Sequence, residues 1–293
     1  MKRILIGLVV VAGGLALLAN NALGIMNALV KTSDLQITTA IAFGSADRQK
    51  LNVYKPERAD GALQPVVVFF YGGSWKRGER DDYLFAAERL TEIGYTVVVP
   101  DYRLYPEVRF PSFVEDAAQA VKWTFDNIEN YDGDPENIFL MGHSAGAHIA
   151  AMLGLDESYL NAVGVDAHRI KGVVGLAGPY AFHPAETANI APIFAALADE
   201  NTARPISFVD GREPPFLLLH GGSDTVVYQE NSTLLAKTMK AAGGTADVIV
   251  YPEVDHIDLV LGLSLSPLRP DQPILADIKS FMDAHLTGST ASR

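Results

Sequence analysis

Short, uninterrupted runs of apolar residues recur along the chain from about residue 66 onward. A run that is apolar at every position is typical of a strand buried on both faces of a sheet. Six such strands are predicted, at 66–70, 96–99, 138–141, 173–176, 216–219 and 248–251. The earlier segment 35–53 is expected to add one or two antiparallel edge strands.

The segments between these strands carry the spacing of helices. The clearest begins at Ser112 and places Phe113, Ala117 and Val121 on one helical face. The Ser112 hydroxyl is predicted to cap this helix, with Glu115 reaching back to complete a capping box. Strands that alternate with helices predict an α/β fold, in which helices cover both faces of a mainly parallel sheet.

The first 30 residues have a different pattern. Lys2 and Arg3 precede an uncharged apolar run at 4–19, and charge returns only at Lys31. Because the run is apolar on every face, a buried helix of the folded domain is the less favoured interpretation. Residues 1–30 are instead expected to be a signal peptide or an N-terminal membrane anchor, with the uncleaved anchor slightly favoured.

The basic residues at the start of such a segment stay in the cytoplasm. The folded domain is therefore expected outside the cytoplasm, either periplasmic or anchored to the inner membrane. A weak small-residue cleavage site at 22–24 leaves cleavage open.

Composition narrows the class of protein. With 48% apolar and 20% charged residues, the 293-residue chain is typical of a globular protein, and no linker divides it. One domain is predicted over 35–288, with a short cap segment at 179–213. The net charge of −12 argues against nucleic acid as a partner. The absence of cysteine excludes a thiolate nucleophile and a thiolate metal site.

The main chemical signal is the pentapeptide Gly-His-Ser-Ala-Gly at 142–146, between a predicted strand and the alanine-rich stretch 147–153. This is the pattern of a nucleophile elbow. Small residues at its ends let strand and helix approach closely, while the serine hydroxyl projects above the sheet edge. Ser144 is therefore the candidate nucleophile.

A serine hydroxyl needs a base to remove its proton, and the base needs a carboxylate to orient it. Asp224 follows the strand 216–219 and His256 follows the strand 248–251. Both positions are strand ends, and the order serine, aspartate, histidine is the one expected for an elbow of this kind. His256 is predicted as general base and Asp224 as the orienting acid. Three rival acids lie too close to His256 in sequence to be held by a separate loop: Glu253, Asp255 and Asp258.

The other histidines are expected to have structural roles. His143 is interpreted as a packing residue or site neighbour, His148 as a packed or hydrogen-bonded residue, and His220 as part of a turn. His168 and His183 are expected at the surface or at helix caps.

An oxyanion needs backbone amide donors. One is predicted at Ala145, directly after the nucleophile. The others are expected from the loop at 71–75, Tyr-Gly-Gly-Ser-Trp, which follows the strand 66–70 and whose glycines allow amides to turn inward.

The resemblance to a known family rests on four features: the loop at 71–75, the stretch Pro-Asp-Tyr-Arg-Leu at 100–104, the elbow, and the Asp224/His256 pair. Together they resemble the esterase and kynurenine formamidase-like (BD-FAE) α/β-hydrolases, from about Leu51 to the C-terminus. The resemblance implies an α/β-hydrolase fold with Gly73 and Ser74 as amide donors opposite Ala145. It also implies a structural pair of Asp101 with Arg103. The family usually has histidine at the first loop position, where this chain has Tyr71, as in isoprenylcysteine methylesterase-like members.

The resemblance and the triad together imply a serine esterase that cleaves small-molecule carboxylic esters, without cofactor or metal. The short cap predicts small to medium acyl groups. Trp75 and Phe182 are expected to bind substrate, with anchoring of the loop as the alternative for Trp75 and simple packing as the alternative for Phe182. Other apolar cap residues are candidates for the same role, with simple packing as the alternative for each: Ile190, Ile193, Phe194 and Leu197. An arylformamidase, amidase or small exopeptidase stays open, as does a non-catalytic binding protein on the same scaffold. The oligomeric state stays open too.

Overall fold

The computed structural model describes residues 23–57, 61–264 and 272–287. Its centre is an eight-stranded sheet in the order β1-β2-β4-β3-β5-β6-β7-β8. The strands are β1 (Leu35–Ala42), β2 (Lys50–Pro56), β3 (Gln64–Phe70), β4 (Thr96–Pro100), β5 (Gly133–His143), β6 (Ile170–Leu176), β7 (Phe216–Gly221) and β8 (Ala246–Tyr251). Strands β3 to β8 are parallel, while β1 and β2 extend the sheet antiparallel. The six predicted strands and the antiparallel edge are confirmed, but β8 lies at the other edge of the sheet, where its residues 248–250 are only partly buried and not covered on both faces as predicted.

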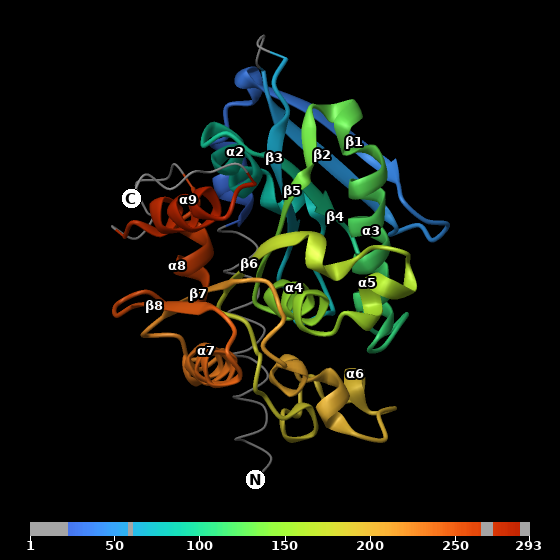
Figure 1. Ribbon diagram of the computed structural model, residues 1–293, viewed down its shortest axis with the longest axis vertical. Helices are drawn as coiled ribbons and strands as arrows, with labels where there is room; N and C mark the ends of the chain where they lie inside the picture. Colours follow the sequence, from blue (N-terminus) through green and yellow to red (C-terminus); the bar gives the residue numbers. More distant parts are fainter. Residues whose placement is uncertain (1–22, 58–60, 265–271, 288–293) are drawn as a thin grey trace.

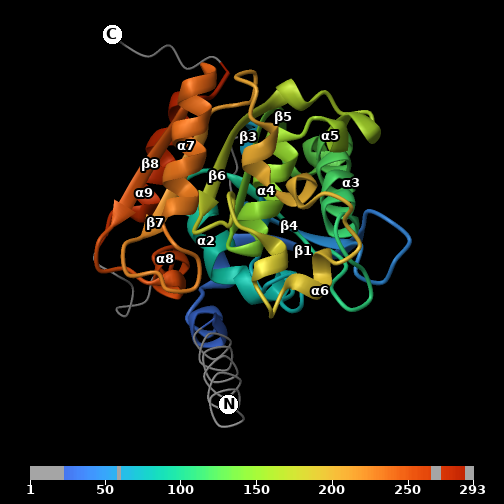
Figure 2. The same cartoon turned by 90° about the horizontal axis from the view of Figure 1, so that it is seen from below.

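Helices cover both faces of this sheet (Figures 1 and 2). The α-helices are α2 (Leu84–Glu92), α3 (Ser112–Asn127), α4 (Ala145–Leu155), α5 (Ser158–Ala162), α6 (Ala191–Phe194), α7 (Glu230–Ala242), α8 (His256–Leu261) and α9 (Ile274–Ala284). Short 3-10 helices are η1 (Thr32–Asp34), η2 (Arg80–Tyr83), η3 (Ile128–Tyr131), η4 (Ala167–Arg169), η5 (Pro184–Glu186), η6 (Glu200–Ala203) and η7 (Pro205–Phe208).

The central strands are buried along nearly their whole length. All five residues of β4 and all six of β7 are buried, as the continuous apolar runs predict. The parallel strands also point the same way, so their carboxyl ends meet at one edge of the sheet. The predicted catalytic residues Ser144, Asp224 and His256 lie together at that edge.

The helix α3 begins where the sequence predicts, but its capping was predicted wrongly. Pro111, not Ser112, occupies the N-cap, and no side chain caps the helix. The carbonyl of Pro111 already accepts hydrogen bonds from the amides of Val114 and Glu115. Ser112 therefore lies one residue inside the helix, past the position from which a hydroxyl can reach the free amides.

Most of the predicted signal peptide or anchor, residues 1–22, lies outside the described residues. The following segment packs on the folded domain: Met26 is buried, and the Asn27 amide group bonds to the carbonyl of Asp81 and the amide of Phe85. Over the described ranges, no helix combines the length and apolar character needed to cross a membrane.

Candidate active site

The turn at Ser144 joins β5 to α4 and is held in a strained conformation. Ser144 has φ 54° and ψ −118°, a region that residues with a side chain rarely adopt. A Cβ atom at Gly146 would lie 2.0 Å from the carbonyl oxygen of Phe70, and one at Gly142 would lie 2.4 Å from the Gly146 backbone. The two glycines of the elbow are thus required by close backbone contact.

Three strand ends bring Ser144, His256 and Asp224 together. The Oγ of Ser144 lies 2.9 Å from Nε2 of His256, and Nδ1 of His256 lies 2.7 Å from Oδ2 of Asp224. Asp224 stands in the loop after β7, and His256 is the first residue of α8. The rival Asp255 is instead the N-cap of α8, where its carboxylate accepts the amides of Ile257 and Asp258.

The Asp224 carboxylate is held ionised. Burial alone would raise its pKa, but hydrogen bonds from His220 and His256 and the proximity of His256 outweigh burial and lower the pKa of Asp224 below its ordinary value. Its other oxygen, Oδ1, accepts the backbone amides of Val226 and Val227 at 2.8 and 2.9 Å. A fixed, charged carboxylate is what an orienting acid requires.

His220 has a larger role than the turn residue that the sequence suggests. Its Nε2 lies 2.8 Å from the carbonyl oxygen of Val227 and 3.5 Å from Oδ2 of Asp224, while Nδ1 lies 2.8 Å from Oγ of Ser232. Because a carbonyl only accepts, Nε2 must carry the hydrogen, and Nδ1 accepts from Ser232. This buried imidazole links the Asp224 loop to α7. No local sequence motif distinguishes it from an ordinary strand-end histidine.

Two further buried histidines are uncharged. Burial lowers the pKa of His143 to about 3 and that of His148 to about 4. His143 Nε2 donates to the carbonyl of His256, and His148 Nε2 donates to the carbonyl of Ala203. Both have the structural roles expected from the sequence. His168 and His183 are exposed, beside Glu157 and Glu200 respectively.

The loop at 71–78, named the oxyanion loop for its predicted role, has an unusual backbone. Gly73, Ser74 and Trp75 have consecutive positive φ angles of 133°, 55° and 58°. A Cβ at Gly73 would lie 2.1 Å from the carbonyl oxygen of Arg77. Ser74 and Ala145 line the same cavity as Ser144. Two of the three predicted donor residues, Ser74 and Ala145, thus face one space, while Gly73 is not among the lining residues. The role of all three as donors stays a prediction.

The expected pairing of Asp101 with Arg103 is wrong. Arg103 turns toward α3, where the fully buried Asp116 accepts its guanidinium at 2.7 Å. Asp101 pairs with Arg80 and accepts the Tyr71 hydroxyl at 3.0 Å. A buried carboxylate needs hydrogen-bond donors to compensate for its lost hydration, and Arg103 supplies them to Asp116.

A cavity of about 420 Å³ opens above Ser144 and is lined mainly by the cap segment and the loop after β7. Trp75, Phe182 and Ile190 form apolar parts of its wall. Trp75 is itself nearly inaccessible, stacked between Phe113 and Phe182 at ring distances of 6.0 Å. Other predicted cap residues pack into the core instead: Ile193, Phe194 and Leu197.

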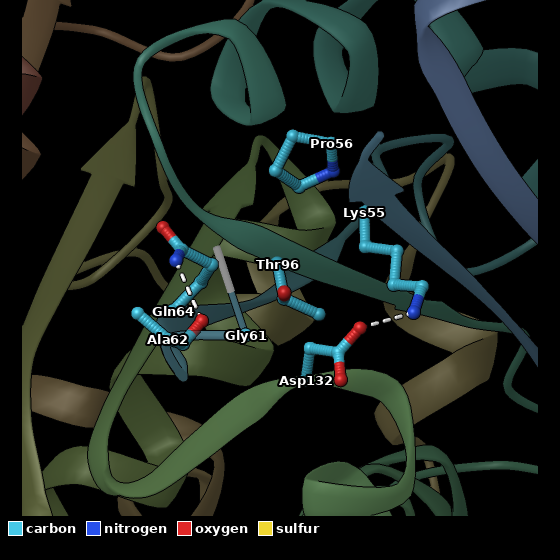
Figure 3. Close-up of a pocket in the computed structure, with 7 residues that line it drawn as sticks. All are labelled: Lys55, Pro56, Gly61, Ala62, Gln64, Thr96 and Asp132. Atoms are coloured by element: carbon cyan, nitrogen blue, oxygen red, sulfur yellow. Dashed lines mark hydrogen bonds and ion pairs between the residues drawn. The ribbon is translucent and has the colours of Figure 1, made fainter. Parts of the chain in front are cut away.

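A second hollow lies at the opposite edge of the sheet, at the amino ends of β3 and β4 (Figure 3). Its volume of about 20 Å³ is enough for one water molecule and no more. Among the described residues, no group of three or more histidine, cysteine or acidic side chains could hold a metal ion. The cavity above Ser144 is therefore the candidate site.

The parallel sheet, the strained serine turn, and the acid and histidine after later strands define an α/β-hydrolase fold. The family model BD-FAE matches residues 51–239, and the chain belongs to this family. The matched stretch contains Ser144 and Asp224, while His256 lies beyond it.

Curated relatives and solved structures agree with this class. The chain is 31% identical over 271 residues to isoprenylcysteine alpha-carbonyl methylesterase ICME of Arabidopsis thaliana, covering 83% of this chain and 61% of the relative. It is 28% identical over 238 residues to esterase LipQ of Mycobacterium tuberculosis, covering 75% and 56%. The chain thus spans about three-fifths of the length of these relatives. A structure of esterase B from Lactobacillus rhamnosis shares the fold with a TM-score of 0.77 at 22% identity, covering 94% of each chain.

Replacing Gly146 by alanine should disrupt the elbow. The added Cβ would clash with the Phe70 carbonyl, so we expect a destabilisation of about 3 kcal/mol or more, measured by thermal unfolding. Gly24→Ala is the matched control, because Gly24, like Gly146, has no positive φ, but no atom lies within 4 Å of an added Cβ. A Gly146→Ala protein as stable as the control would contradict the close-contact account.

His148 should contribute to acid sensitivity. The unfolded chain takes up a proton at His148 as the pH falls through about 6.5, whereas the folded protein does so only near 4. Stability is therefore lost between these values, by about 3 kcal/mol from this residue. Denaturant unfolding of His148→Gln at pH 7 and pH 4 should show a smaller loss than wild type. The exposed His168→Gln should behave like wild type, and equal losses in all three proteins would refute the assignment.

Proposed function

We propose that this protein hydrolyses carboxylic esters through an acyl-enzyme formed on Ser144. The observation that carries the proposal is the continuous line of hydrogen bonds from Ser144 Oγ through His256 to Asp224, at 2.9 and 2.7 Å. Such a line activates a serine that would otherwise be a poor nucleophile.

In the first half of the reaction, Ser144 Oγ attacks the ester carbonyl while His256 Nε2 takes its proton. Asp224 accepts the Nδ1 hydrogen of His256, fixes the tautomer and stabilises the imidazolium. The tetrahedral oxyanion accepts hydrogen bonds from the backbone amides of Ala145, Gly73 and Ser74. His256 then protonates the leaving alcohol, and in the second half it activates the water that hydrolyses the acyl-enzyme.

One observation supports an ester as substrate, and another supports a small or medium acyl group. The relatives described above are named methylesterase and esterase, which supports cleavage of an ester bond. The apolar wall near Ser144 is filled by stacked rings, since Trp75 lies between Phe113 and Phe182. Space for a long acyl chain is limited by these rings. Trp75 and Phe182 are proposed as the residues that contact the substrate.

We further propose that residues 1–30 export the protein or anchor it to the inner membrane, with the catalytic domain outside the cytoplasm. The support is the sequence pattern of Lys2, Arg3 and the apolar run at 4–19. Fractionation of cells expressing the full chain tests this proposal. Recovery of the protein in the cytoplasmic fraction would overturn it.

The serine mechanism is tested with p-nitrophenyl acetate, butyrate and octanoate beside the matching anilides. Wild type should hydrolyse the esters, and Ser144→Ala should lower kcat/KM by about 10⁴-fold or more. Ser158→Ala, an exposed serine distant from the elbow in sequence, serves as control. Folded wild type that cleaves only the anilides would favour an amidase, and activity that survives in Ser144→Ala would sink the mechanism.

Acyl specificity is tested at Phe182, which is only half-buried and lines the cavity. Phe182→Ala should open space beside Trp75 and raise the octanoate-to-acetate ratio of kcat/KM by about tenfold. Phe125→Ala, a half-buried ring under Arg169, is the control. An unchanged ratio would remove Phe182 from the list of specificity residues.

A further inference from the structure

We propose that Arg48 is a positioning residue for catalysis, because its guanidinium ties both ends of the oxyanion loop to the sheet. The inference rests on the proposed function of that loop as the source of oxyanion donors. It concerns a residue 96 positions before Ser144, outside every motif of the sequence.

The contacts of Arg48 reach three residues, two at the ends of the oxyanion loop and one after β4. Its Nη2 donates to the Tyr71 hydroxyl and to the carbonyl oxygen of Gly78, both at 2.7 Å. Its Nε donates to the carbonyl oxygen of Tyr102 at 3.0 Å. Tyr71 and Gly78 are the first and last residues of the oxyanion loop, so one planar group sets the separation of its ends.

The hydrogen bonds around Tyr71 are mutually consistent. Its hydroxyl hydrogen goes to Oδ1 of Asp101 at 3.0 Å, which leaves a lone pair of the same oxygen to accept from Arg48. The backbone carbonyl of Tyr71 accepts the Tyr102 hydroxyl at 2.8 Å, and the rings of Tyr71 and Tyr102 stack at 4.6 Å. The first end of the loop is therefore fixed at both its side chain and its backbone.

The loop needs this support because its own backbone is strained. Ser74 and Trp75 hold positive φ angles, which cost about 1 kcal/mol or more each for residues with a side chain. The loop also closes tightly, since a Cβ at Gly78 would lie 2.8 Å from the carbonyl oxygen of Gly72. Without a tie between the ends, relaxation of these angles would turn the amides of Gly73 and Ser74 away from the carbonyl of a bound ester.

Arg48 is itself held in place by the fold. It lies in the turn between β1 and β2, and the neighbouring Gln49 donates to Asp116 of α3 at 2.8 Å. The amide of Asp101, at the end of β4, donates to the carbonyl of Lys50. The antiparallel edge of the sheet thus supplies a rigid base for the guanidinium. Arg48 does not line the cavity, so it acts through the loop and does not touch substrate.

The test uses Arg48→Lys in the full chain. Lysine keeps the charge but has no planar fork to serve three acceptors at once. With p-nitrophenyl butyrate we expect kcat to fall by about 10- to 100-fold and KM to change less than twofold, because the donors act on the transition state. The dissociation constant of butylboronic acid, whose serine adduct is tetrahedral, should rise by a similar factor.

Two further variants make the test specific. Tyr71→Phe removes the first of the two ties together with the hydrogen bond to Asp101, but it keeps the tie to Gly78, so its kcat should fall less than that of Arg48→Lys. Arg169→Lys changes a surface arginine that pairs with Glu136 and should leave kcat, KM and boronate affinity unchanged. All rates are expressed per folded molecule, from circular dichroism at the assay temperature.

The outcomes separate the two proposals. The role of Arg48 would be overturned if wild type and Arg48→Lys were equally active, or if the unfolded fraction of Arg48→Lys fully explained its loss of activity. Either outcome would leave the proposed function intact. Folded wild type that neither cleaves the ester nor binds the boronate would overturn the proposed function, and the positioning role with it.

Discussion

The contact between the elbow and the strand beside it governs the geometry of the whole site. Gly146 lies so close to β3 that a Cβ there would come within 2.0 Å of the Phe70 carbonyl oxygen and 2.5 Å of that of Tyr71. Tyr71 is also the first residue of the oxyanion loop. The nucleophile turn and the loop that faces it are therefore positioned by one shared backbone contact. A Cβ at Gly72 would in turn lie 3.2 Å from Cβ of Ser144. A shift of either segment would move the other.

Burial and hydrogen bonding determine which side chains around the proposed triad are charged. His143 packs against His256 with ring centres 4.9 Å apart, and its lowered pKa keeps it neutral. A second cation at that distance would oppose formation of the His256 imidazolium. Asp224, in contrast, is held ionised by the hydrogen bonds from His220 and His256. Burial thus suppresses charge where it would hinder proton transfer, and hydrogen bonding preserves charge where it helps.

The parts of this arrangement that a local sequence pattern encodes could be predicted from the sequence. The continuous apolar runs predicted the strands, because a strand covered on both faces excludes polar residues. The elbow and the strand-end positions of Asp224 and His256 predicted which residues meet. The contacts of Arg48 and His220 could not be predicted, because they join side chains to carbonyls and hydroxyls that no local spacing specifies. The Asp101–Arg103 pairing failed for a related reason: the partner of Arg103 is Asp116, on a helix whose orientation the motif does not contain.

The cap is held by hydrogen bonds and ring contacts to residues other than Ser144, His256 and Asp224. Asn231 of α7 accepts the amide of Ala181, and Arg204 donates to the Ala181 carbonyl. His148 Nε2 donates to the Ala203 carbonyl, and Trp75 packs edge-on against Phe194. None of these bonds includes a member of the proposed triad. Side chains of the cap that face the cavity can therefore vary without moving Ser144, His256 or Asp224. Trp75 differs from the cap residues, because it belongs to the oxyanion loop and also lines the cavity. A change there would alter acyl fit and loop geometry together.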